Sequence, residues 1–185
     1  MTRFDRYQHH RRSIRMPSYD YGSDGPYFLT VCTFKRACVF GDVRDDAVVL
    51  NSYGAIVREE LERSTEIRPG FVLHAFVVMP NHLHALADLP EVEEGMGVGE
   101  TVGAHSCAPL HAGFRRQGRS LASFVAQFKA TVTRRINAER ATPGQAVWQR
   151  NYYEHIVRDD EDLSRIREYI EENPRRWAED EYYSA

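Results

Sequence analysis

Apolar residues recur along this chain at two spacings, which predict where strands and helices form. Three segments hold short runs of aromatic and β-branched residues, as β-strands do: residues 27–34, 71–80 and 82–90. Three others repeat apolar residues every three or four positions, as amphipathic helices do: residues 45–66, 121–138 and 159–173. Residues 38–41 suggest a small strand or a turn, and residues 146–157 a strand or extended segment.

The predicted order is strand, helix, strand, strand, helix, strand, helix. The tight connection at 79–81 suggests an antiparallel hairpin. Hairpin-linked strands with helices between them favour an α+β fold, a mainly antiparallel sheet with helices on one face. The βαββαβ order within it is that of ferredoxin-like and RRM-like cores.

Composition suggests how the domain is bounded. We expect residues 1–25, rich in Arg, His, Tyr and Ser, to form a basic arm, and residues 179–185 to form a tail. The domain between them spans 26–178 and contains a mobile loop at 91–118, where no periodicity survives.

Overall composition restricts the class of protein. Of 185 residues, 42% are hydrophobic and 28% are charged, which excludes wholesale disorder. No run approaches the roughly 20 apolar residues of a membrane span. Three cysteines without a CxxC spacing favour a reducing compartment, so we expect a cytoplasmic protein.

Charge is segregated along the chain, although the net charge is only −3. Residues 1–40 hold seven Lys and Arg against three Asp and Glu, and residues 114–150 hold eight against one. The acidic residues gather in 41–113 and 151–185. Such blocks can create a positive surface on an acidic protein, although solvated helix faces give the same pattern.

The sharpest chemical feature is the sequence His82-Leu83-His84. On a strand, residues two apart share a face, so both imidazoles project together and could bind one divalent metal. Two satisfied or surface histidines would give the same pattern. The HxHxDH pattern of metallo-hydrolases is excluded because position 86 is Leu, and no second motif completes the paired HxT or HxS pattern of cyclic phosphodiesterases.

The last predicted helix carries a second candidate pair. Tyr169 and Asn173 are four residues apart and therefore stack on one helix face, beside the apolar stripe. If that stripe packs on the sheet, both side chains overhang its surface, where they could meet the histidines. A tyrosine packed at a helix edge and an asparagine C-cap are the structural alternative.

Several segments resemble one family. VVMPNHLH (77–84) resembles the HUH motif of single-tyrosine HUH transposases. RRSIR (11–15) and YFLTVC (27–32) resemble the N-terminal region of the REP-associated tyrosine transposases within that superfamily. WQRNYYEHIVR (148–158) and IREYIEENP (166–174) resemble their C-terminal signature. The resemblance covers most of the chain except the predicted loop.

The resemblance implies cleavage and joining of single-stranded DNA near hairpin, REP-like sequences through a 5′-phosphotyrosine intermediate. Carried over by position, His82 and His84 bind Mg²⁺ or Mn²⁺ and Tyr169 is the nucleophile. Asn173 is the expected third ligand, with Glu172 as runner-up. The family implies a monomer or a homodimer, working at the nucleoid.

Arginine suits contacts to phosphates and to guanine. We therefore expect the basic blocks to bind DNA through six residues: Arg11, Arg12, Arg15, Lys129, Arg134 and Arg135.

Two other functions remain open at this point. A non-catalytic, RRM-like nucleic-acid-binding module would need exposed aromatics in RNP-like strands, and no such run is present. A histidine-based metal hydrolase acting on small molecules would lack a third ligand at a standard spacing, and it would not explain the basic blocks.

Overall fold

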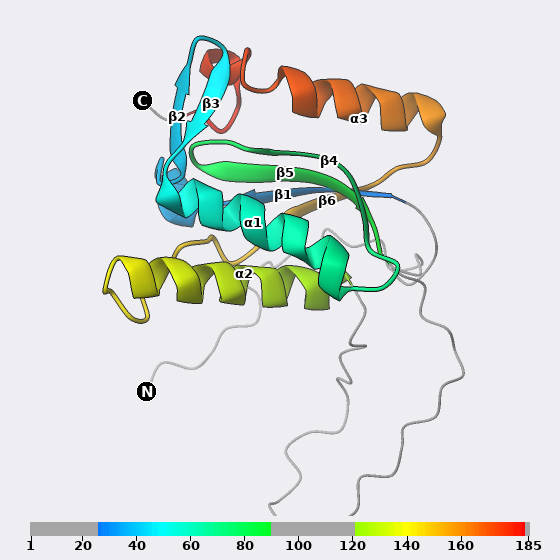
Figure 1. Cartoon of the computed structure of the whole chain (residues 1–185). Coiled ribbons are helices and arrows are strands. Elements are labelled where there is room, and N and C mark those ends of the chain that lie inside the picture. Colours follow the sequence, from blue (N-terminus) through cyan, green and yellow to red (C-terminus); the bar gives the residue numbers. More distant parts are fainter. Residues whose placement is uncertain (1–25, 90–120, 184–185) are drawn as a thin grey trace, which may run out of the picture.

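The computed structural model describes residues 26–89 and 121–183 (Figure 1). The predicted arm 1–25 with Arg11, Arg12 and Arg15 lies outside the described residues, as does the predicted loop 91–118.

A four-stranded antiparallel sheet organises the domain. Its strands are β1 (Tyr27–Cys32), β4 (Val72–Val78), β5 (His82–Asp88) and β6 (Tyr153–Ile156). They lie in the order β4-β5-β1-β6, and each neighbouring pair is antiparallel. This is the strand order of a ferredoxin-like βαββαβ core, so the predicted α+β class is confirmed.

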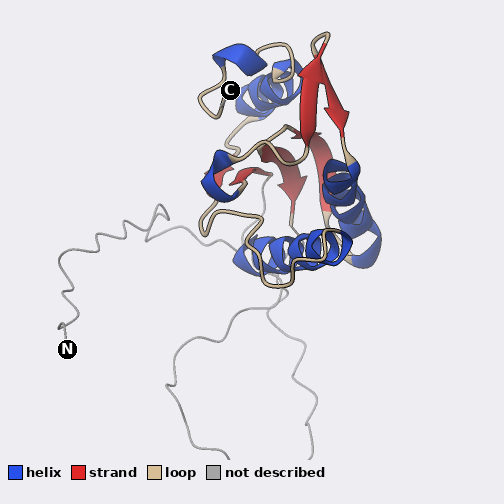
Figure 2. Ribbon diagram, turned by 90° about the vertical axis from the view of Figure 1, so that its left-hand side faces the viewer, coloured by secondary structure: helices blue, strands red, loops and turns tan. Residues whose placement is uncertain are grey.

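Helices cover both faces of this sheet and not one face as predicted, because both faces carry apolar side chains. Helices α1 (Ser52–Ile67) and α2 (Leu121–Glu139) lie on one face, and α3 (Asp160–Glu172) lies on the other (Figure 1). In Figure 2 the sheet is viewed along its strands and lies between these two layers. Because strand residues alternate between faces, β5 serves two cores. Leu83 and Ala85 join the larger core with α1 and α2, whereas Leu86 joins the smaller core under α3.

The predicted helix 45–66 begins too early. Asp45 and Asp46, with φ of 49° and 60°, form a tight turn between β2 (Gly41–Arg44) and β3 (Ala47–Leu50). Two successive residues in the left-handed region are what a type I′ hairpin turn requires, and aspartate tolerates it. The helix begins instead at Ser52, because the Asn51 side chain accepts hydrogen bonds from the next turn's backbone.

The segment 146–157 is only partly a strand. Trp148 forms an isolated bridge with Thr33, and regular pairing starts at Tyr153. Between them, the carbonyls of residues 149–151 accept hydrogen bonds from Lys129 Nζ on α2. In this stretch the backbone carbonyls therefore bond to the Lys129 ammonium and not to a neighbouring strand.

Two short 3₁₀ turns complete the described chain: η1 (Phe34–Arg36) and η2 (Trp177–Glu179). After α3, residues 177–183, coloured red in Figure 1, turn back over the sheet. We call residues 177–183 the C-terminal segment. It includes most of the predicted tail, 179–185, and its side chains Trp177 and Tyr182 pack on His82 of β5.

Candidate active site

The two predicted histidines share one face of β5. His82 is 0% exposed and His84 is 1% exposed, and their ring centroids lie 4.5 Å apart. Leu83 points into the opposite core, as strand alternation requires. The structure therefore confirms the geometric part of the prediction from His82-Leu83-His84.

The neighbouring strand β1 orients His84. Thr30 pairs with His84 across the sheet, and its Oγ1 lies 2.8 Å from His84 Nδ1. Phe28 stacks on the ring at 5.2 Å. With Nδ1 held by the threonine, the other ring nitrogen, Nε2, faces α3.

Asn81 fixes the tautomer of His82. Its Nδ2 donates to the carbonyls of Arg36 and Tyr182, at 3.1 and 2.7 Å, so its Oδ1 must be the atom that faces His82 Nδ1 at 2.8 Å. A carbonyl oxygen only accepts, so Nδ1 carries the proton and Nε2 carries a lone pair. His82 Nε2 is buried and has no hydrogen-bond partner within residues 26–89 and 121–183.

Burial keeps both imidazoles neutral. Loss of solvation lowers the pKa of His82 to about 3, although the nearby Asn173 amide opposes this shift. Burial, with His82 beside it, also holds the pKa of His84 well below its usual value. Neutral imidazoles are the form that binds a metal.

Helix α3 delivers Tyr169 to this pair. Its hydroxyl lies 3.3 Å from His84 Nε2, and its ring packs edge-on against Phe28. Burial, reinforced by the charges of Asp180 and Glu181, raises the pKa of Tyr169 to about 12. The phenol is therefore protonated near neutral pH unless a cation lies beside it.

The two candidates for a third ligand have different surroundings. Asn173 is the C-cap of α3 and is 2% exposed; its Nδ2 donates to Asp180 Oδ2 at 3.0 Å, and its Oδ1 has no partner among the described residues. Glu172 accepts a hydrogen bond from Arg175 Nη1 at 2.6 Å. The structure thus brings Asn173 to the histidines and shows Glu172 paired with an exposed arginine.

Sequence reasoning missed two residues at the site, Asp180 and Tyr182. In the described part of the chain, Asp180 forms a group with His82 and His84 whose ligand atoms all lie within 4.8 Å of one another. The Tyr182 ring lies 4.8 Å from that of His82. The sequence after Pro174 has no periodic pattern that would have indicated either residue.

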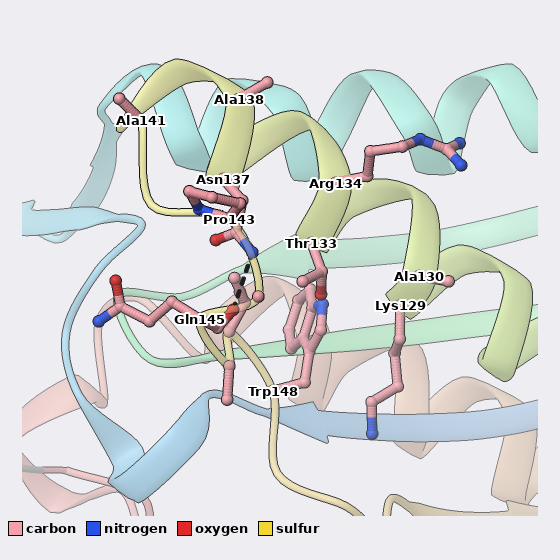
Figure 3. Close-up of a pocket in the computed structure, with 13 residues that line it drawn as sticks. Lys129, Ala130, Thr133, Arg134, Asn137, Ala138, Ala141, Pro143, Gln145 and Trp148 are labelled. Carbon is pink, nitrogen blue, oxygen red and sulfur yellow. Dashed lines mark hydrogen bonds between the residues drawn. The ribbon is translucent and has the colours of Figure 1, made fainter.

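Helix α2, which carries the three predicted DNA-binding residues, lies on the opposite side of the sheet from α3, which carries Tyr169 (Figure 1). Lys129 and Arg134 line a cavity of about 840 Å³ between α2 and residues 141–148 (Figure 3). Lys129 donates to backbone carbonyls, and Arg135 pairs with Glu59 and Glu60 on α1. Arg134 is exposed.

Within residues 26–89 and 121–183, no helix combines the length and apolar character needed to cross a membrane.

Comparisons with known proteins show which sequences and folds resemble this chain. No protein-family model matches it. It is 37% identical to an uncharacterized protein of Haemophilus influenzae over 98% of both chains. It is also 27% identical to a second protein of that organism, provisionally named a REP-associated tyrosine transposase, over 84% of this chain and 73% of that one.

A solved structure shares the fold. It is that of a REP-associated tyrosine transposase bound to a REP hairpin, with a TM-score of 0.53 and 21% identity, covering 95% of this chain and 74% of that chain. The chain is thus similar to REP-associated tyrosine transposases, to one in sequence and to another in fold, which confirms the resemblance seen in its motifs.

Proposed function

We propose that this protein is a metal-dependent endonuclease and strand-transferase that cleaves single-stranded DNA near hairpins through Tyr169. The observation that carries the proposal is the 3.3 Å approach of the Tyr169 hydroxyl to Nε2 of His84, inside a buried histidine pair. A tyrosine that served only for packing would not need its hydroxyl to face a buried histidine nitrogen.

The residues present fit a divalent cation. His82 Nε2 is a buried lone pair without a partner among the described residues, and both Nδ1 atoms are engaged by oriented neighbours. This second layer of hydrogen bonds is typical of metal-binding histidines. His82 and His84 would hold Mg²⁺ or Mn²⁺, and the nitrogen donors favour Mn²⁺ because Mg²⁺ prefers oxygen ligands. Asn173 Oδ1, buried and unpartnered among the described residues, is the proposed third ligand.

When bound, the cation would polarise the scissile phosphate and offset the charge that develops on it. The oxygen of Tyr169 attacks the phosphorus, and its proton passes to water. The bond from phosphorus to the 3′ oxygen breaks and that oxygen takes a proton from water, which leaves a free 3′-hydroxyl and a 5′-phosphotyrosine. The link keeps the energy of the phosphodiester, so a 3′-hydroxyl can reverse the step and join strands.

We assign a hairpin-forming single strand as the substrate, because the solved relative in fold was bound to a REP hairpin. Arg134 is the exposed cation of the predicted α2 set, and we propose that it contacts DNA together with Arg11, Arg12 and Arg15. Lys129 and Arg135, also predicted, are engaged within the chain. This substrate would place the protein at the nucleoid, in the cytoplasm.

Tyr169 meets the histidines of its own chain, so one molecule holds a complete site. The arrangement supports a monomer as the cleaving unit.

The RRM-like alternative needs a sheet face on which bases can stack. Here the corresponding face is covered by α3, and Phe28 on it is only 8% exposed. This observation supports catalysis over passive binding.

The test is a covalent adduct between the protein and a hairpin oligonucleotide labelled at its 3′ end, formed in Mn²⁺ and resolved on a denaturing gel. We expect wild type to form it and Tyr169→Phe to form none. The matched control is Tyr182→Phe, which removes a second phenol near the histidines and should leave the adduct intact. An adduct that survives in Tyr169→Phe and disappears in Tyr182→Phe would identify Tyr182 as the nucleophile and contradict the proposal.

A further inference from the structure

We propose that Asp180, in the C-terminal segment, is a further protein ligand of the cation held by His82 and His84. The inference rests on the proposed function, since it adds a ligand to the same site. Asp180 lies outside the tyrosine helix and outside every motif visible in the sequence.

The first support is distance. The ligand atoms of His82, His84 and Asp180 all lie within 4.8 Å of one another. Donors on one small divalent ion lie roughly 2.0–2.3 Å from it, so two of them are separated by at most about 4–5 Å. The three side chains already satisfy that limit.

The second support is that the site holds polar atoms without partners. His82 Nε2 and Asn173 Oδ1 are both buried, and neither has a hydrogen-bond partner among the described residues. Their residues are 0% and 2% exposed. An unpaired buried polar atom costs free energy, and a cation between these atoms would remove that cost for both.

The third support is that the carboxylate is held in place. Asn173 Nδ2 donates to Asp180 Oδ2 at 3.0 Å, and the backbone N–H of Tyr182 donates to Oδ1 at 2.6 Å. Each oxygen therefore receives one hydrogen bond and keeps a lone pair for a cation. A carboxylate whose orientation is fixed in this way loses little entropy when it binds an ion.

The C-terminal segment is itself anchored beside the histidines. Arg36 Nη1 donates to the carbonyl of Glu181 at 2.8 Å, and its guanidinium lies 5.0 Å from the Tyr182 ring centroid. Asn81 Nδ2, which orients His82 through the other end of its amide, donates to the carbonyl of Tyr182. One asparagine thus couples the histidine pair to the segment that carries Asp180.

The charges are also suited to the substrate. The two histidines are neutral, so Asp180 would supply the negative charge of the three-residue group. A divalent cation with one carboxylate keeps a net charge of +1, which matches the single negative charge of a phosphodiester. A site with two or three carboxylates would repel the same group.

The experiment measures Mn²⁺ binding to the full chain without DNA, by the loss of the electron paramagnetic resonance signal of free Mn²⁺. We expect Asp180→Asn to weaken binding at least about tenfold. The matched control is Glu181→Gln, which removes a charge from the adjacent residue and should leave binding within about twofold if ligation rather than net charge matters. His82→Ala reports on the site as a whole.

Each outcome decides one question. If His82→Ala loses Mn²⁺ and Asp180→Asn binds like wild type, Asp180 is no ligand, while the proposed function stands. If neither variant weakens binding, the metal site of the proposed function is itself wrong. An equal loss in Glu181→Gln and Asp180→Asn would attribute the effect to charge and overturn the inference. Thermal melts without metal check folding, and Mn²⁺ should raise the melting temperature of wild type more than that of Asp180→Asn.

Discussion

Thr30→Val removes a single hydroxyl from a buried position while keeping the shape of the side chain. Thr30 is 2% exposed, and its Oγ1 is the partner of His84 Nδ1 at 2.8 Å. Valine cannot form that hydrogen bond, so Nδ1 of a 1% exposed histidine loses its partner. The imidazole also becomes free to choose its tautomer and to rotate.

The expected losses of folding free energy and of metal affinity follow from the missing hydrogen bond and from the freed imidazole. A buried polar group left without its partner costs about 1–3 kcal/mol of folding free energy. Losing the residue that orients a metal-binding histidine weakens metal affinity about 10–100-fold, which is about 1.4–2.7 kcal/mol. No cavity forms, because threonine and valine have nearly equal volumes, so packing adds little to either figure.

Urea unfolding measures the first loss, and Mn²⁺ titration followed by electron paramagnetic resonance measures the second. Thr30→Ser is the matched control: it keeps the hydroxyl and loses a methyl group, so it should lose about 1 kcal/mol of stability with little change in Mn²⁺ affinity. If Thr30→Val binds Mn²⁺ within twofold of wild type, the threonine does not orient the ligand.

Three further changes probe other parts of the structure. A Cβ at Gly54 would lie 2.2 Å from the carbonyl oxygen of Phe40, so Gly54→Ala should lose about 1–3 kcal/mol in urea unfolding rather than gain helix stability. The pKa of His82 is about 3 when folded and about 6.5 when unfolded; the unfolded chain therefore takes up the proton first, and stability should fall as pH drops below about 6.5. His82→Gln should show a shallower fall, and equal slopes would contradict this. Arg135→Met breaks pairs with the exposed Glu59 and with the buried Glu60, which keeps Arg63 as a partner; it should cost under about 1 kcal/mol, less at high salt, and a larger, salt-independent loss would point to packing.

Periodicity predicted the parts of the site that lie on regular elements. Alternation along β5 placed His82 and His84 on one face, and the four-residue spacing on α3 placed Tyr169 and Asn173 together. Both inferences need only the geometry of one element. The resemblance of His82-Leu83-His84 to a known motif then supplied their chemistry.

The other features of the fold and of the site depend on contacts between elements, which the pattern of one element does not determine. The helix 45–66 was predicted too long because Val49 and Leu50 fit a helical spacing, whereas the Asp45-Asp46 turn assigns them to a hairpin. Thr30 faces His84 only through the register of β1 with β5. Asp180 reaches the site through anchors from η1 and Asn81, both far away in sequence.

The pairing of Tyr169 with histidines of its own chain limits how much DNA one molecule can process. Under the proposed mechanism, each copy stores one broken phosphodiester at a time, whereas excising a segment requires two breaks. The second break must wait until the first end has been passed to a 3′-hydroxyl, or it must be made by another copy bound to the same strand. Under that mechanism, the placement of Tyr169 therefore makes excision either sequential on one copy or shared between two.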